Sequence, residues 1–138
     1  DQGFYDVAAT SSHPFVASHS NARSITGHTR NLTDDMIRIL AEKGGVTGLT
    51  FARSFLAEPP NCRVEDMVRH VKHIYQVGGI DVIAIGSDFD GTKPPLEVAN
   101  SSEIGKLITG LAKAGFSDED LEKICYLNAA RVIREVLG

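Results

Sequence analysis

Residues 81–91 read Asp81-Val82-Ile83-Ala84-Ile85-Gly86-Ser87-Asp88-Phe89-Asp90-Gly91, an apolar run that ends in small and acidic residues. A short, continuous apolar run is typical of a strand that is buried on both faces of a parallel sheet. The pair Gly78-Gly79 precedes the run and closes a stretch with helical spacing. These residues predict a helix, a buried strand and a polar loop at the carboxyl end of that strand.

The same unit occurs twice earlier in the chain. The apolar runs Pro14–Ala17 and Val46–Phe51 predict two further buried strands. Between and after the strands the spacing is helical, with Thr33 as an expected N-cap and Ser117 with Asp120 as a capping-box-like start. The expected helical segments are residues 4–9, 33–43, 64–75, 104–111 and 117–136. This alternation predicts an α/β fold with a parallel sheet and right-handed crossovers.

Composition excludes several classes of protein. The chain has 138 residues, 42% of them hydrophobic and 23% charged, which is typical of one globular domain and not of disorder or a coiled coil. A net charge of -4 without a Lys/Arg cluster argues against nucleic acid as a partner. No apolar run approaches the roughly 20 residues that span a bilayer. The two cysteines, Cys62 and Cys125, fit a reducing compartment, so we expect a cytoplasmic location.

Parallel α/β folds collect their functional groups at the carboxyl ends of the strands. Three positions here meet that rule, namely His19, the region of Thr50, Arg53 and Ser54, and Asp88 with Asp90. His19 follows the first strand, and a neutral imidazole there can bind a metal or can simply hydrogen-bond within its loop. Arg30 comes 11 residues later and can hold a carboxylate through two parallel hydrogen bonds, although an ordinary exposed arginine is the alternative.

Asp88 and Asp90 follow the third strand. If the strand geometry continues, their side chains point to opposite sides, so that one faces a pocket and the other braces the loop. A carboxylate in this place can bind metal, accept a substrate ammonium group or transfer a proton. The alternative is turn formation, to which an Asp-Gly pair is well suited.

His70 and His73 lie three residues apart on one expected helix, which is compatible with metal binding. We place both outside the apolar stripe of that helix and find no acidic or cysteine partner for them. The interpretation that we favour for this pair is a solvated helix face.

Four stretches together resemble the renal (membrane) dipeptidase family of zinc metallopeptidases. They are Phe15-Val16-Ala17-Ser18-His19-Ser20-Asn21-Ala22-Arg23, Arg30-Asn31-Leu32, Ile83-Ala84-Ile85-Gly86-Ser87-Asp88-Phe89-Asp90-Gly91 and Asn128-Ala129-Ala130-Arg131-Val132. Their order and spacing agree along the whole chain. The combination of S-H-S-N-A-R with G-S-D-F-D-G is specific.

The resemblance implies a metal-dependent, TIM-like (β/α)8 barrel with two zinc ions at the carboxyl ends of its strands. Residues 1–138 would then be a single C-terminal segment that carries strands 6–8. The resemblance further implies that His19 is a zinc ligand, that Arg30 holds the terminal carboxylate of a dipeptide and that Asp88 contacts its amino group or assists proton transfer. A metal hydroxide would attack the peptide carbonyl.

Several family residues have no counterpart in these 138 residues, namely the H-x-D of the first strand, a metal-bridging Glu and a further zinc-binding His. Because catalytic zinc sites use three or more protein ligands, we expect the chain alone to be inactive and to bind zinc weakly or not at all. We therefore expect either a homo-oligomer or pairing with an N-terminal part of the barrel. One alternative is a non-catalytic assembly module that pairs through open sheet edges. Another is a different metal-dependent barrel hydrolase.

Overall fold

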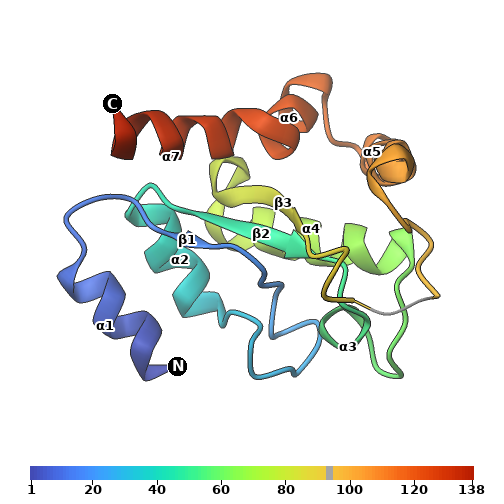
Figure 1. Cartoon of the computed structure of the whole chain (residues 1–138), viewed down its shortest axis with the longest axis horizontal. Helices are drawn as coiled ribbons and strands as arrows, with labels where there is room; N and C mark the ends of the chain where they lie inside the picture. The colour runs from blue at the N-terminus through green and yellow to red at the C-terminus, as the bar shows by residue number, and fades with distance from the viewer. Residues whose placement is uncertain (93–94) are drawn as a thin grey trace.

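The computed structural model describes residues 1–92 and 95–138. Within them, β1 (Val16–Ala17), β2 (Val46–Thr50) and β3 (Ile83–Ser87) form one parallel sheet in the order β1-β2-β3 (Figure 1). The register pairs Val16 with Val46 and Thr47 with Ile83. The expected parallel α/β architecture is confirmed.

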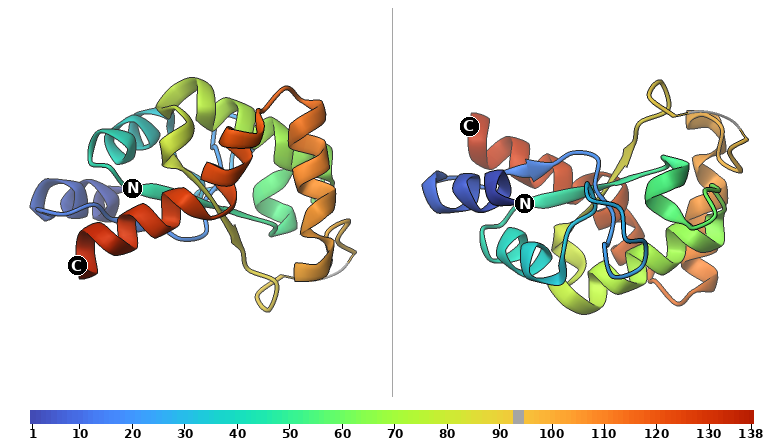
Figure 2. Two further views of the ribbon diagram at one scale, coloured as in Figure 1. Left: turned by 90° about the horizontal axis from the view of Figure 1, so that it is seen from above. Right: turned by 90° about the horizontal axis from the view of Figure 1, so that it is seen from below.

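Helices separate the strands in the expected order. They are α1 (Gln2–Thr10), α2 (Asp34–Glu42), α3 (Arg53–Leu56), α4 (Val64–Gly78), α5 (Ile104–Lys113), α6 (Asp118–Glu122) and α7 (Asn128–Leu137). Two 3-10 turns, η1 (Ile80–Val82) and η2 (Ser101–Glu103), and one π-helical turn, η3 (Lys123–Leu127), connect them. The four-residue helix α3 is not among the helical segments expected from the sequence. α1 and α5 lie at opposite ends of the molecule (Figure 2).

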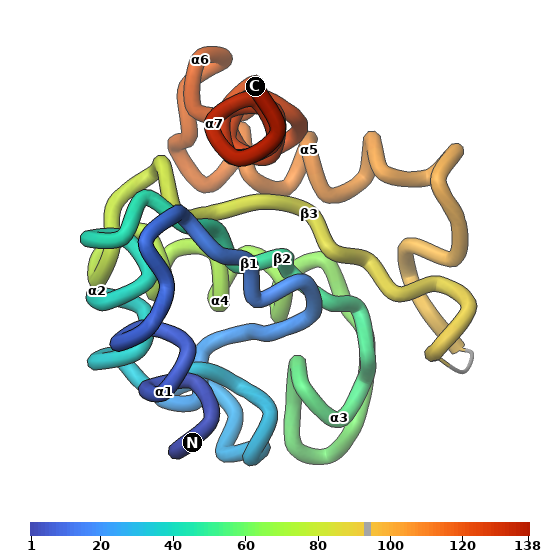
Figure 3. The backbone as a smooth tube through the Cα atoms, turned by 60° about the vertical axis from the view of Figure 1, so that its left-hand side comes forward, coloured from blue at the N-terminus to red at the C-terminus, as the bar shows by residue number. Residues whose placement is uncertain are grey.

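Alternation along the strands directs side chains to two different layers. Leu49 and Ile83 belong to the main core, which also includes the buried side chains of α2 and α4. Val46 and Ala84 point to the opposite face, where they pack against Val132 of α7. Figure 3 shows α7 on one side of the strands. The sheet is therefore covered by helices on both faces near the amino ends of its strands.

The helix boundaries follow local chemistry. The Thr33 hydroxyl accepts a hydrogen bond from the backbone N–H of Met36, so the predicted N-cap of α2 is confirmed. The predicted capping box of α6 is also present, because the Ser117 and Asp120 side chains each bond the backbone of the other. Gly44, with φ 69°, directly follows α2 and its C-cap, in the left-handed conformation that glycine adopts without a Cβ clash.

The first strand differs from its prediction. We expected Pro14–Ala17 to be buried, but Val16 is 51% exposed and β1 has only two residues. The reason is its position, because β1 lies at one edge of the sheet and only β2 pairs with it among the described residues. An edge strand leaves one row of backbone groups and part of its apolar surface uncovered.

The prediction that His70 lies on a solvated helix face is also wrong. His70 is fully buried, not solvated, because its position is i+3 from Met67 and i−4 from Ile74 and so falls within the apolar stripe of α4. His73 lies nearer the surface, and its Nε2 atom is 2.7 Å from Oδ1 of Asp34 on α2. The hydrogen bond from His73 holds the pKa of Asp34 below its usual value.

Candidate active site

His19 lies just beyond β1, in a segment that continues the sheet irregularly. The Ser20 N–H donates to the Gly48 carbonyl at 3.0 Å, and the Thr47 hydroxyl donates to the Ser20 carbonyl at 2.8 Å. The imidazole is partly buried, and its Nδ1 atom is buried with no hydrogen-bond partner among the described residues. An unpaired buried nitrogen costs free energy, which favours the ligand interpretation of His19 over a histidine bonded within its loop.

The segment before His19 crosses the face of the sheet. The Ser18 carbonyl oxygen lies so close to Gly48 and Gly86 that a Cβ atom at either glycine would overlap it. These two glycines are neighbours on β2 and β3, and their lack of a side chain gives the segment room. Ser18, next to His19, is thereby brought close to Gly86 of β3, which lies two residues before Asp88.

Asp88 does not continue the strand, so the extended geometry from which we expect Asp88 and Asp90 to point to opposite sides ends before them. Ser87 has φ 26° and Asp88 has φ 67°, so the alternation of an extended strand stops at Ser87. The Gly91 N–H donates to the Asp88 carbonyl at 3.1 Å and closes a turn. The Asp88 carboxylate folds so closely over Gly91 that a Cβ atom there would meet it. Such consecutive positive φ angles in residues other than glycine store strain and cluster at functional sites.

Arg30 lies near the end of the loop between β1 and α2, and its side chain is exposed. Its guanidinium carbon is 5.0 Å from the centre of the Phe55 ring of α3. The His28 ring packs on the same aromatic ring at 4.0 Å between centroids, and the Arg30 N–H donates to Nδ1 of His28 at 3.2 Å. Arg30 therefore lies on an aromatic support and keeps donors for an anionic group.

His19 and Asp88 lie just beyond the carboxyl ends of β1 and β3, and Arg30 contacts Phe55 of α3, the helix that follows β2. Hydrogen bonds or ion pairs between any two of His19, Arg30 and Asp88 are absent from the described residues. Within the same residues no three His, Cys, Asp or Glu side chains gather in a way that could hold a metal ion. In the described residues His19, Arg30 and Asp88 are therefore separate groups and not members of one such cluster.

Sequence reasoning missed the buried polar groups beneath these residues. Asn21, Asn31 and His70 are all fully buried, yet each side chain is hydrogen-bonded. The signal for His70 was available in its helical position. For Asn21 and Asn31, which lie in a loop without periodicity, the sequence offered none.

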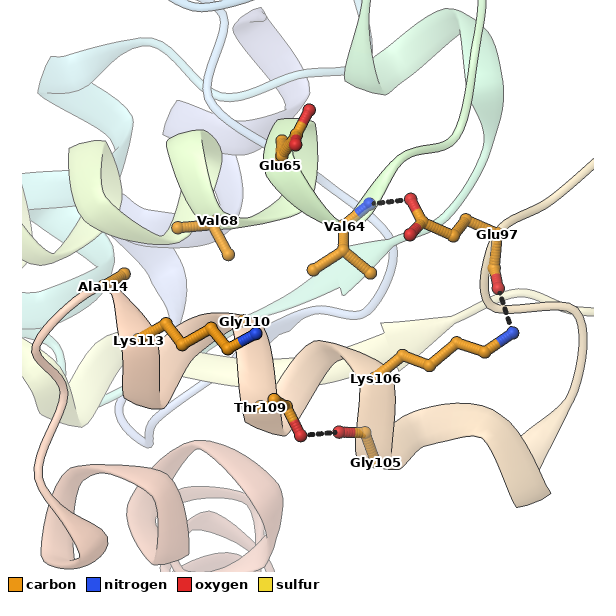
Figure 4. A pocket seen from close by; sticks show the side chains of 10 residues that line it. All are labelled: Val64, Glu65, Val68, Glu97, Gly105, Lys106, Thr109, Gly110, Lys113 and Ala114. Atoms are coloured by element: carbon orange, nitrogen blue, oxygen red, sulfur yellow. Dashed lines mark hydrogen bonds between the residues drawn. The ribbon is translucent and has the colours of Figure 1, made fainter.

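A separate groove of about 750 Å³ lies between α4 and α5 (Figure 4). Its lining includes Val64, Val68 and Gly110, with Lys106 at one end. The Lys106 ammonium donates to the Glu97 carbonyl at 2.9 Å and pairs with Glu103 at 3.0 Å. None of the three candidate residues lines this groove, so the groove is not part of the candidate active site.

No helix in the described part of the chain combines the length and apolar character needed to cross a bilayer.

The chain is similar to several known proteins. Curated relatives include a protein from the pqqA 5′ region of Klebsiella pneumoniae, 34% identical over 99% of this chain and 52% of its own length. Dipeptidase ataJ of Aspergillus terreus is 36% identical over 95% of this chain and 33% of its own length. The chain therefore spans between one third and about one half of these relatives.

A crystal structure of a metallopeptidase from Rhodobacter sphaeroides, liganded with a phosphinate mimic of L-Ala-D-Ala, matches with a TM-score of 0.91. That enzyme is 35% identical, and the match covers 98% of this chain and 40% of the other. The neighbours have a TIM-barrel-like fold, and this chain matches its C-terminal portion, as the resemblance implied. The family model for membrane dipeptidases matches residues 1–137. The chain therefore belongs to the membrane dipeptidase family, peptidase family M19.

Proposed function

We propose that this chain is the C-terminal barrel segment, residues 1–138, of a zinc-dependent dipeptidase. The match to the membrane dipeptidase family across residues 1–137 carries the proposal. The R. sphaeroides relative binds a mimic of a dipeptide, which supports a dipeptide as the substrate class here too. The cytoplasmic location stays a prediction.

His19 is the group in this chain that we assign to zinc. Its buried, unpartnered Nδ1 atom fits a metal ligand better than a structural histidine. One histidine is too few, because catalytic zinc sites use at least three protein ligands. The remaining ligands would come from the part of the relatives that this chain does not match. Bound zinc would supply Lewis-acid polarisation of the peptide carbonyl and activation of water.

Arg30 and Asp88 would hold the two ends of the substrate. A dipeptide is a short zwitterion, so a guanidinium for its carboxylate and a carboxylate for its ammonium group fix its direction. The Asp88 carboxylate would contact the ammonium group or hold a proton during cleavage.

A second candidate is assembly through the open edges of the sheet. The exposed side chain of Val16 on the edge strand β1 favours it. Light scattering of the 138-residue chain tests this candidate, because a monomer at high concentration would contradict edge pairing. A stable dimer would support pairing between two copies of this chain. In the other form of this candidate, the same sheet edge pairs with an N-terminal part of the barrel.

The catalytic proposal is tested by grafting. The matching segment of the R. sphaeroides metallopeptidase is replaced by this chain, and hydrolysis of L-Ala-D-Ala is followed with zinc and then with a chelator. We expect chelator-sensitive hydrolysis by the chimera and none by the 138 residues alone. A folded, zinc-loaded chimera without activity would contradict the proposal. Hydrolysis by the isolated chain would contradict its dependence on further ligands.

A further inference from the structure

The loop that carries His19 and Arg30 is irregular but well packed. Between β1 and α2 the described backbone forms one isolated bridge, Ala22–Leu32, and otherwise only local turns and single hydrogen bonds such as that from Ser20 to Gly48. Nevertheless Asn21, Ala22 and Asn31 are fully buried. A loop with so little regular pairing needs side chains to satisfy its buried backbone groups.

Asn31 satisfies two of these groups and one backbone group of α3. Its side-chain N–H groups donate to the carbonyls of Thr26 and Phe55, both at 2.9 Å, and its oxygen accepts from the N–H of Asn21 at 3.0 Å. The amide thus uses both of its donors and its acceptor. It joins two parts of the loop to α3, which contributes Phe55.

Asn21 extends this link to the sheet. Its side-chain oxygen accepts from the Thr50 N–H at 2.9 Å, and its side-chain nitrogen donates to the Thr50 carbonyl at 3.0 Å. The side chain therefore replaces a neighbouring strand at the carboxyl end of β2. The loop is fixed to the end of the strand where the site lies.

His70 reaches the same loop from α4. Its Nδ1 atom is 3.1 Å from the N–H of Ala22, which can only donate, so Nδ1 must accept. The proton of the neutral ring is then on Nε2, which donates to the Leu56 carbonyl at 3.0 Å. Both nitrogens are used, so His70 has no nitrogen left for a metal ion.

The two networks meet beneath Arg30. Asn31 follows Arg30 in the chain and binds the carbonyl of Phe55, whose ring supports the Arg30 guanidinium. His70 binds the carbonyl of the next residue, Leu56. The place of the aromatic support relative to the loop is therefore set by two buried side chains.

We propose that Asn31 and His70 are positioning residues that lock the loop carrying His19 and Arg30 to α3, so that Phe55 holds Arg30 toward the substrate site. The purpose of this positioning rests on the proposed function of Arg30 in carboxylate binding. The positioning itself requires neither zinc nor substrate.

The test is an NMR measurement on the 138-residue chain. A guanidinium over an aromatic face places the Arg30 side-chain protons in the shielding region of the Phe55 ring, so their resonances move upfield. The Phe55→Leu variant gives the chemical shifts of the Arg30 side-chain protons in the absence of the ring. We expect Asn31→Ala and His70→Asn to lose the upfield shift, while the methyl resonances of Leu49 and Ile83 keep their native positions. His73→Gln, three residues from His70 on the same helix, should retain it.

Amide hydrogen exchange provides a second readout. The N–H of Ala22 should exchange up to about tenfold faster in His70→Gln, which lacks the ring acceptor, because one hydrogen bond is lost. The Ile74 amide of α4 should be unchanged. An unaltered Arg30 shift in folded Asn31→Ala would overturn the proposal. So would simultaneous loss of all native signals in every variant, because the network would then serve general stability. Absence of dipeptide hydrolysis by the chimera contradicts only the proposed function.

Discussion

The carbonyl oxygen of Ser18 occupies the space that a Cβ atom would need at Gly86. Gly48, the neighbour of Gly86 on β2, faces the same oxygen. The segment leading to His19 therefore lies directly on the backbone of two strands. This close approach couples the place of His19 to the absence of side chains at both glycines.

Gly86→Ala should lower the free energy of unfolding by about 1–3 kcal/mol, because backbone atoms on both sides cannot yield to the added methyl group. Urea denaturation of the 138-residue chain measures the change. Gly105→Ala is the matched control, since its Cβ would meet nothing within 4 Å on the exposed start of α5. The control should keep or raise stability by up to about 1 kcal/mol. Equal effects of the two substitutions would contradict the close packing of Ser18 on Gly86.

The alternation of strands and helices could be predicted because its signals are local. The apolar run before Gly86 and the glycine pair after α4 are read within a few residues. The exposure of Val16 is not a local property, since it depends on what pairs with the free edge of β1. The turn at Asp88 matches the alternative that the Asp-Gly pair offered, whereas the expected side-chain alternation applies only while the backbone stays extended.

The three candidate residues could be predicted from the sequence, but the buried side chains that support them could not. His19, Arg30 and Asp88 follow strands or precede a helix cap, which the sequence shows directly. The bonds of Asn31 reach residues 5 to 24 positions away, and those of His70 reach 48 positions. No periodic pattern encodes such contacts, so they become visible only in the folded chain.

His70 should make stability depend on pH. Burial lowers the pKa of His70 from 6.5 to about 4. Between these values the unfolded chain binds a proton that the folded chain does not, so the free energy of unfolding rises as pH rises from 4 to 6.5. The contribution of this residue amounts to roughly 3 kcal/mol, is complete above pH 6.5 and is lost progressively as pH falls toward 4.

Urea denaturation at several pH values between 4 and 7 measures this dependence. His70→Asn, which does not titrate, should show a flatter profile in that interval. Asp34 affects the free energy of unfolding in a different pH range. A carboxylate with a lowered pKa loses its stabilising contribution only as the pH falls below its pKa in the unfolded chain, 3.8. Identical profiles for the native chain and His70→Asn would exclude a buried neutral imidazole.

Asn128→Ala should reduce the free energy of unfolding by about 1–3 kcal/mol. Its side-chain nitrogen donates to the carbonyls of Ile80 and Ile83, both at 2.8 Å, so the buried amide ties α7 to the start of β3. The substitution leaves the buried Ile83 carbonyl and the partly buried Ile80 carbonyl without this donor. Thermal unfolding followed by circular dichroism measures the loss. Lys113→Ala, at an exposed position of α5, should change stability by less than about 0.5 kcal/mol.

Arg30→Gln in the chimera should raise KM for L-Ala-D-Ala about tenfold to hundredfold with a smaller change in kcat, because it removes a charge-assisted bond to the substrate carboxylate. The same substitution should have little effect on hydrolysis of a dipeptide whose C-terminal carboxylate is converted to an amide. Arg38→Gln, an exposed arginine on α2, is the control for a change of net charge. Steady-state kinetics with both substrates measures the difference. If Arg30→Gln impaired both substrates equally, Arg30 would support the fold of the loop and would not recognise the carboxylate.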